Sequence, residues 1–166
     1  MQVRWSMKVW AYACLVMGLL LFAVPAGALI PDHIEVGTDT TWVTAGGGGT
    51  ATVTARVTDS SSAPVAGVGV DFEVDSKYGS ISPAHAEAGD DGKATAVFRP
   101  GIVAGDARIT ATVAQDASLT NYTDLHIDHA TPPDKVVNLW YSPKVTAGGE
   151  AKIIVRMVDR YGNVVD

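Results

Sequence analysis

The chain has 166 residues, of which 18% are charged, and its formal net charge is −6. A composition rich in Thr, Val, Ala and Gly favours short strands and turns over helices. Without the first 28 residues, 10 basic residues stand against 18 acidic ones and the net charge is −8, which argues against nucleic acid as a partner.

Residues 1–28 have the pattern of a secretory signal peptide. Arg4 and Lys8 supply positive charge, a long apolar run follows, and Ala26-Gly27-Ala28 is a small-x-small cleavage pattern. We predict cleavage after Ala28, with an uncleaved N-terminal anchor as the alternative, and therefore a secreted or cell-surface protein. The single cysteine, Cys14, lies in this segment, so we expect a mature domain without disulfides, thiol catalysis or cysteine-bearing metal sites.

The remainder of the chain alternates between apolar and polar residues over short stretches. In the clearest of them, Thr50 to Asp59, every second residue from Ala51 to Val57 is apolar. Ala84 to Ala88 is compatible with a helix but too short to form one dependably. The pattern predicts about seven strands, at residues 31–36, 50–59, 68–74, 78–82, 94–98, 107–113 and 122–128.

Seven short strands in about 100 residues are typical of an immunoglobulin-like antiparallel β-sandwich, which we place at residues 31–130. Residues 131–133, Thr-Pro-Pro, read as a stiff linker. The all-β prediction then extends to residues 134–166 as the start of a second sandwich.

A repeat supports this second domain. Val43-Thr44-Ala45-Gly46-Gly47 recurs 102 positions later, starting at Val145, and Pro31-Asp32 recurs at the same spacing from Pro133. Two strands cannot bury their own apolar face. We therefore expect residues 134–166 to be an incomplete repeat, either a fragment of a longer reading frame or a half-domain completed by another chain. The apolar face in question consists of Ala151, Ile153, Val155 and Met157.

These motifs resemble the bacterial immunoglobulin-like repeats of group 1, known from invasin and intimin adhesins. The matching stretches are Ala51-x-Val53-x-Ala55-x-Val57-x-Asp59, Pro64 to Phe72, and Asp91-Gly92-Lys93-Ala94-Thr95. The Asp-x-x-Gly-Asn motif that is frequent in the family is Asp59-Ser60-Ser61-Ser62-Ala63 in the first copy and Asp159-Arg160-Tyr161-Gly162-Asn163 in the second. The resemblance implies an exported sandwich used in tandem as a stalk or adhesion array. It supplies no catalytic residues.

Two acidic groups are candidate metal sites. Asp124, His126 and Asp128 share one face of a predicted strand, with His129 beside them, but no ligand spacing here is diagnostic. An acidic face for calcium consists of Asp71, Glu73 and Asp75, with Asp90 and Asp91 nearby. An ordinary solvated sheet face is the simpler interpretation of both, and we predict neither a metal nor a cofactor.

Two further patterns concern modification and surface charge. Asn121-Tyr122-Thr123 matches the N-glycosylation sequon. Arg56 and Arg156 precede Asp59 and Asp159 by three residues, which we interpret as an exposed charge pair at the end of a strand.

The sequence predicts a non-enzymatic surface protein acting as a spacer or adhesion stalk. No motif links Ser, His and Asp into a catalytic group, and a sandwich of this size has little room for a cleft. The expected partner is a cell-surface protein or glycan, with membrane contact only through the N-terminal segment or a further C-terminal region. The alternatives are a non-catalytic module of a larger extracellular enzyme and a subunit that exchanges strands in assembly.

Overall fold

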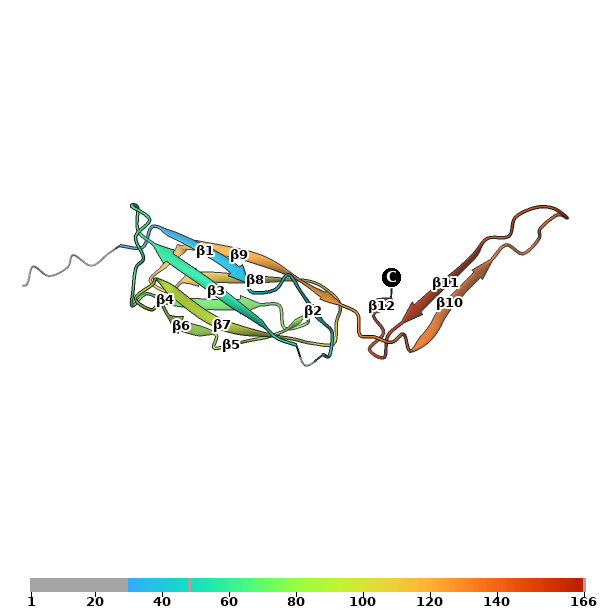
Figure 1. The fold of residues 1–166 in the computed structure, drawn as a ribbon, viewed down its shortest axis with the longest axis horizontal. Coiled ribbons are helices and arrows are strands. Elements are labelled where there is room, and N and C mark those ends of the chain that lie inside the picture. Colours follow the sequence, from blue (N-terminus) through green and yellow to red (C-terminus); the bar gives the residue numbers. More distant parts are fainter. Residues whose placement is uncertain (1–29, 48, 166) are drawn as a thin grey trace, which may run out of the picture.

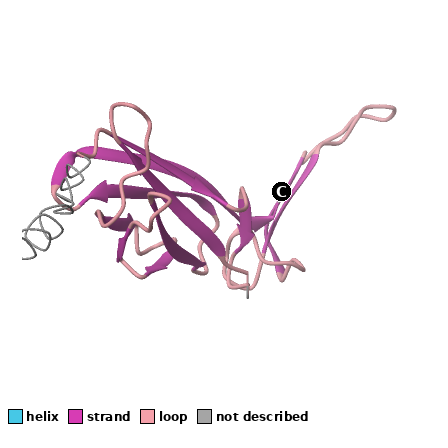
Figure 2. Cartoon of the chain, turned by 60° about the vertical axis from the view of Figure 1, so that its left-hand side comes forward, coloured by secondary structure: helices cyan, strands magenta, loops and turns pink. Residues whose placement is uncertain are grey.

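The computed structural model describes residues 30–47 and 49–165, so the predicted signal segment and the cleavage position after Ala28 lie outside it. Within these ranges the chain forms strands, turns and loops, and none of its described residues is helical (Figure 2). This described part accordingly holds no helix with the length and apolar character needed to span a membrane.

The first sheet of the sandwich has four antiparallel strands in the order β1-β3-β7-β5 (Figure 1). The short β5 lies at the edge of this sheet, as the sequence predicted for residues 78–82. The four strands are β1 (His33–Thr38), β3 (Ala51–Thr58), β7 (Lys93–Pro100) and β5 (Gly79–Ser82).

The second sheet has five strands in the order β2-β9-β8-β4-β6. β2 pairs with β9 in parallel, whereas the other pairs are antiparallel. The chain leaves the first sheet after β1 and continues into the second without reversing. The predicted antiparallel sandwich is therefore confirmed, with one parallel pair at this edge. The five strands are β2 (Trp42–Thr44), β9 (Asp116–Asp128), β8 (Gly105–Val113), β4 (Gly69–Val74) and β6 (His85–Glu87).

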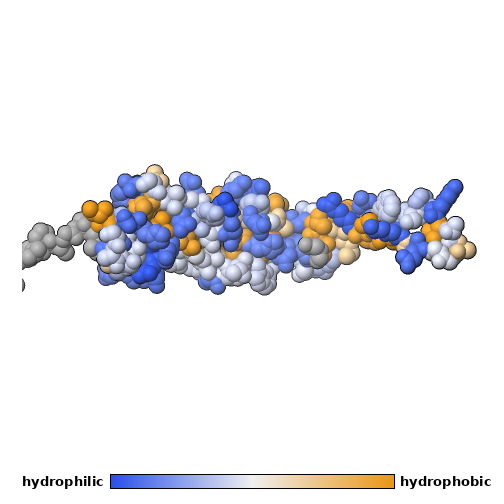
Figure 3. Space-filling model, turned by 90° about the horizontal axis from the view of Figure 1, so that it is seen from above, coloured by the Kyte–Doolittle hydropathy of each residue, from blue (hydrophilic) through white to orange (hydrophobic). Residues whose placement is uncertain are grey.

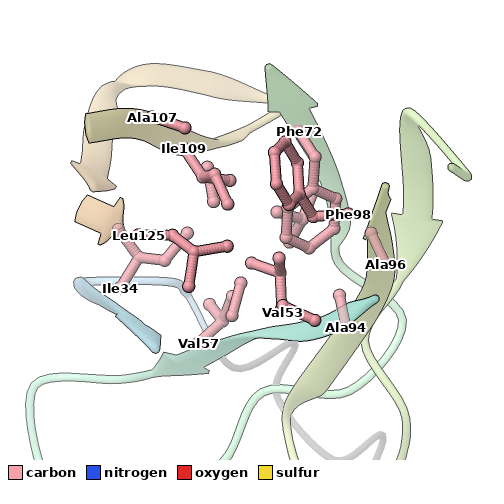
Figure 4. Packing of buried hydrophobic residues seen from close by; sticks show 14 of the residues in the cluster. Ile34, Val53, Val57, Phe72, Ala94, Ala96, Phe98, Ala107, Ile109 and Leu125 are labelled. Carbon is pink, nitrogen blue, oxygen red and sulfur yellow. The ribbon is translucent and has the colours of Figure 1, made fainter. Parts of the chain in front are cut away.

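The inward faces of the two sheets share one hydrophobic core (Figure 4). Every second residue of β3 from Ala51 to Val57 is fully buried, as alternation predicted. Phe72 of β4 and Phe98 of β7 lie side by side between the sheets, and both are buried. Each large apolar side chain removed from water in this way contributes on the order of 2 kcal/mol, which is how a domain with no cysteine among its described residues is held together.

A third, antiparallel sheet lies beyond one end of the sandwich and is reached through Thr131-Pro132-Pro133 (Figure 1). We call it the C-terminal sheet; it contains β10 (Lys135–Tyr141), β11 (Ile153–Val158) and β12 (Val164–Val165). Most of its large apolar side chains are exposed, and hydrophobic residues reach its surface in Figure 3. Ile153 is 64% exposed and Val155 50%, as expected for strands without a facing sheet.

All seven predicted strands of the sandwich are present, and the structure adds to them. Residues 42–44, expected only to lead into a glycine turn, form β2. Residues 85–87, within the stretch considered compatible with a helix, form β6 at a sheet edge. β9 begins at Asp116 rather than Tyr122 because its polar first half pairs with β8 as a hairpin.

Candidate functional site at the junction of the sandwich and the C-terminal sheet

The turn between β11 and β12, Asp159–Asn163, lies against the end of the sandwich, and we call it the junction turn. Oδ1 of Asp159 accepts the backbone N–H groups of Tyr161 at 2.8 Å and Asn163 at 2.9 Å. Oδ2 accepts the backbone N–H of Ala130 at 2.7 Å and the side-chain amide of Asn163 at 2.8 Å. The fully buried carboxylate thus ties its own turn to the last residues of the sandwich.

These hydrogen bonds set the ionisation of Asp159. Burial by itself raises the pKa of the carboxyl group, because the charged form loses water. Hydrogen bonds from Asn163, Ala130 and Tyr161 outweigh burial and lower the pKa to about 2. Asp159 is therefore a stable anion at neutral pH, and its charge strengthens the bonds that it accepts.

The predicted exposed charge pair between Arg156 and Asp159 is wrong, since Asp159 is buried and accepts backbone and amide N–H groups. Its counterpart Asp59 likewise accepts N–H groups, from Ser61 and Ala63. The hydrogen bond from the Ser61 hydroxyl, together with these N–H groups, lowers the pKa of Asp59. Each aspartate lies just past the end of its strand, where the N–H groups of the following turn take up its carboxylate.

Two side chains of the junction turn reach across to the sandwich. Nδ2 of Asn163 donates to the carbonyl oxygen of Ile102 at 2.8 Å, and its Oδ1 accepts the N–H of Ala104 at 2.9 Å. The ring of Tyr161 lies against Gly46, where an added Cβ would overlap the ring. Gly46 also has a φ of +60°, in the left-handed region that favours glycine. Glycine is therefore favoured at this position for two reasons, the backbone conformation and the space that the ring occupies.

A groove of about 350 Å³ runs along this junction. Two imidazole rings line it, and that of His126 lies with Nδ1 2.8 Å from Oδ1 of Asp106. Nδ1 of His129 is 3.3 Å from the carbonyl oxygen of Ala130. The groove is lined by Ala104, Gly105, His126, Ile127, Asp128, His129, Asn163 and Val164.

The structure separates the residues of the candidate metal site on β9. Asp124 is engaged by Arg108, whose Nε and Nη2 donate to its two carboxylate oxygens at 3.0 and 3.3 Å. The guanidinium of Arg108 also lies over the ring of Tyr122, 3.9 Å from the ring centroid. His126 turns to Asp106 instead. Residues 30–47 and 49–165 contain no group of three or more His, Cys, Asp or Glu side chains placed to hold a metal ion.

The carboxylates of the acidic face considered for calcium interact with different neighbouring groups. Asp71 lies 2.6 Å from Nδ1 of His85 on the neighbouring β6. Asp75 accepts the backbone N–H of Lys77 at 3.0 Å. Asp91 accepts the backbone N–H of Lys93 at 3.1 Å, in the turn before β7. These three carboxylates each satisfy a nearby donor rather than converging on a shared centre.

The sequon residue Asn121 lies half-buried in β9, opposite Ala111 of β8. Its Nδ2, the atom to which a glycan would be attached, donates to the carbonyl oxygen of Ile34 in β1 at 2.9 Å. Its Oδ1 accepts the N–H of Tyr122 at 2.8 Å. Attachment of a glycan to the folded domain would require the bond to β1 to break, so the fold does not favour modification at this position.

Sequence reasoning did not find the junction contacts. The sequence places Asp159 in a family turn motif and in a charge pair with Arg156, places Asn163 in the motif alone, and assigns no role to Tyr161. The motif itself was the available signal, because the second copy retains the Gly and Asn that the first copy lacks. The partners, Ile102, Ala104 and Ala130, are ordinary loop residues that only the fold identifies.

The model of the bacterial Ig-like domain (group 1) family matches residues 33–126, which run from the first residue of β1 nearly to the end of β9. The chain belongs to this family. The matched range lies within the described sandwich and agrees with the resemblance noted from the sequence motifs.

Solved structures with the same fold include InvD and invasin. InvD of Yersinia pseudotuberculosis matches with 21% identity and a TM-score of 0.58, over 84% of this chain and 44% of that one. Invasin, described as a bacterial integrin-binding protein, matches with 20% identity and a TM-score of 0.57, over 80% of this chain and 27% of that one. No curated protein sequence matches this chain.

An enzyme also contains a similar domain. A glycosyl hydrolase family 2 member from Bacteroides cellulosilyticus matches with 19% identity and a TM-score of 0.51, over 61% of this chain and 15% of that one. At these identities all three likenesses show the fold, an immunoglobulin-like β-sandwich. The chain spans less than half of each of these three structures.

Proposed function

We propose that this protein is an exported immunoglobulin-like repeat protein that acts as a structural spacer or adhesion stalk at the cell surface. The observation that carries the proposal is the end-to-end arrangement in Figure 1, where the C-terminal sheet continues beyond one end of the sandwich. Asn163 and Asp159 hold it there with hydrogen bonds to Ile102, Ala104 and Ala130. Such an arrangement adds length with each unit.

The surface of the sandwich supports a presenting role more than a chemical one. Acidic side chains on its sheets are paired with neighbouring basic side chains, as in Asp124 with Arg108 and Asp71 with His85. The excess of acidic residues keeps an exported domain soluble and disfavours polyanions. The partner we propose is a cell-surface protein or glycan and not a nucleic acid. The membrane would be contacted through the N-terminal segment if that segment stays uncleaved, or through a further C-terminal region.

Export is tested by producing the full chain in a bacterial host and separating the cell fractions. We expect the protein outside the cytoplasm with an N-terminus at Leu29, measured by mass spectrometry of the intact chain. Retention in the cytoplasm would remove the surface role. An unprocessed chain in the membrane fraction would support the uncleaved anchor instead.

The spacer role is tested by small-angle X-ray scattering of the exported chain. An extended particle, with the C-terminal sheet in line with the sandwich, is the expected result. A particle in which the C-terminal sheet folds back along the side of the sandwich would contradict it. Beads coated with the chain, applied to protein- and glycan-coated surfaces, then distinguish an adhesive unit from a passive spacer.

A second candidate is a non-catalytic module of a larger extracellular enzyme, favoured by the similar domain in the glycosyl hydrolase. The reading frame downstream of Asp166 separates the two. Further repeats that resemble residues 31–130 support the stalk, whereas a catalytic domain supports the enzyme module.

Strand exchange between copies is a third candidate, favoured by the exposed apolar residues of β10 and β11. Leu139 is 57% exposed and Trp140 51%, which is unusual for large apolar side chains on a sheet. Analytical ultracentrifugation of the exported chain decides this point. A concentration-independent monomer contradicts strand exchange, and a dimer lost on deletion of residues 134–166 supports it.

A further inference from the structure

The chain contains two copies of one turn with the same backbone. In the junction turn, the N–H of Asp159 donates to the carbonyl oxygen of Asn163 at 2.9 Å and the N–H of Gly162 donates to that of Asp159 at 3.0 Å. In Asp59–Ala63, which we call the sandwich turn, the bonds at the equivalent positions are both 2.9 Å. Asp59 and Asp159 also accept the same two backbone N–H groups, two and four residues later.

The two turns differ in what their side chains can reach. The third position is Ser61 in the sandwich turn, whose hydroxyl donates back to Oδ1 of Asp59 at 2.7 Å, and the fifth is Ala63, which has no polar side chain. In the junction turn these positions are Tyr161 and Asn163, and both reach the sandwich. We call Tyr161 and Asn163 the arm of the junction turn. The sandwich turn has the same backbone but no such pair of side chains.

The surface that receives this arm belongs entirely to the sandwich. The N–H groups of Ala104 and Ala130 lie outside the strands and donate to side chains of the junction turn, namely Asn163 Oδ1 and Asp159 Oδ2. The carbonyl oxygen of Ile102 accepts from the same Asn163. Gly46 makes room for the ring of Tyr161. These groups lie together at the end of the sandwich that faces the C-terminal sheet.

We propose that Tyr161 and Asn163 form a directional lock between successive modules, in which the turn of one module grips the end of the module before it. This inference rests on the proposed function as a tandem stalk. The specific partner of the Tyr161–Asn163 arm is the far end of a group 1 sandwich, recognised by a backbone carbonyl and N–H pair and a left-handed glycine. The sandwich turn, with Ser61 and Ala63, is not equipped to grip another module.

The test is amide hydrogen exchange, measured by NMR on the full chain, in the parent and in the variants Asn163→Ala and Ala63→Asn. Loss of a single hydrogen bond is worth about a tenfold change in local protection, so in Asn163→Ala we expect exchange at Ala104 to rise by about tenfold or more. The amide of Val53 in the core strand β3 should be unchanged. The matched variant Ala63→Asn should change neither amide, because the N–H of Ala104 is bonded to the junction turn and not to the sandwich turn.

A second measurement addresses orientation and does not depend on one amide. Residual dipolar couplings should give one common alignment tensor for the sandwich and the C-terminal sheet in the parent. In Tyr161→Ser, which copies Ser61 and leaves the backbone bonds of the turn in place, the two tensors should diverge while β10 and β11 stay paired. This separates loss of the lock from loss of the C-terminal sheet.

Two results would overturn the proposal. One is rapid exchange of Ala104 and Ala130 in the parent; the other is unchanged exchange and alignment in both Asn163→Ala and Tyr161→Ser. A failed lock in a chain that is still exported and extended rejects this inference alone. A protected Ala104 in a chain retained in the cytoplasm rejects the proposed function alone.

Discussion

The sandwich and the C-terminal sheet contain strands with nearly the same sequence pattern, but the apolar side chains are buried in the first and exposed in the second. Val53 in β3 is fully buried, whereas Ile153, at the equivalent place in β11, is 64% exposed. Both strands follow a Val-Thr-Ala-Gly-Gly turn and both alternate. The difference is the facing sheet, which β3 has and β11 lacks among the described residues. Alternation therefore specifies which face can be buried, and the rest of the domain determines whether it is.

The largest effect should come from the shared core of the sandwich. Phe98→Ala removes a fully buried ring between the two sheets and should lower the free energy of unfolding by about 3–5 kcal/mol. Urea unfolding of the full chain followed by circular dichroism measures it. A loss below about 1 kcal/mol would mean that the two sheets are not packed as described.

A matched pair of substitutions makes the comparison directly. Val53→Ala should cost the sandwich about 2–3 kcal/mol of unfolding free energy because two buried methyl groups are lost. Ile153→Ala, at the equivalent exposed position, should change stability by less than about 0.5 kcal/mol. Equal losses in the two variants would show that Ile153 is covered in solution, for example by a second copy.

Asp159 is the buried anion that connects the two regions. Asp159→Ala leaves the N–H groups of Ala130, Tyr161 and Asn163 without their acceptor and should weaken attachment of the C-terminal sheet by about 1–3 kcal/mol. Limited proteolysis between the sandwich and the C-terminal sheet should become faster. Asp59→Ala, in the partly exposed sandwich turn, is the control and should leave that cleavage rate unchanged.

Acid should weaken the contacts between the sandwich and the C-terminal sheet by protonating Asp159. The pKa of Asp159 is lowered to about 2 in the folded chain, against about 3.9 in an unfolded one. A depressed pKa contributes stability that is complete above the unfolded value and is lost as the pH falls from about 4 toward 2. The amide chemical shift of Ala130 should follow this titration with a midpoint near 2. A midpoint near 4, or the same titration in Asp159→Asn, would contradict it.

The smallest effect is expected at the arginine that the sequence paired with Asp59. Arg56 is exposed on β3, and Asp59 is held by backbone N–H groups instead. Arg56→Ala should therefore change the free energy of unfolding by less than about 0.5 kcal/mol, with no dependence on salt. A larger, salt-sensitive loss would show that Arg56 and Asp59 do form a charge pair.

The strands with clean alternation were predictable because burial of one face leaves a period of two in the sequence. Those that were missed lack this signal. His85-Ala86-Glu87 contains no β-branched residue, and only its pairing with β4 makes it a strand. The early part of β9, from Asp116, is polar and is fixed by its hairpin partner β8.

The junction was harder to predict because its partners are distant in sequence and chemically ordinary. Asp159 bonds to Ala130, 29 residues earlier, and Asn163 to Ile102, 61 residues earlier. Backbone carbonyl and N–H groups are present at every position, so no residue type marks the ones that Asn163 will contact. The family motif in the sequence could indicate that the turn has a particular role, but it could not identify the residues that the turn contacts.

Gly46 gives the repeated Val-Thr-Ala-Gly-Gly stretch a second role, because the stretch contacts Tyr161 as well as forming the turn before a strand. Its counterpart Gly148 has the same left-handed conformation, with a φ of +83°, and an added Cβ there would meet only open space. The same stretch thus begins a module and leaves room for the tyrosine of the module that follows. In a tandem stalk of the kind proposed above, a further module that carries Tyr and Asn in its turn would be added by duplication without any new interface.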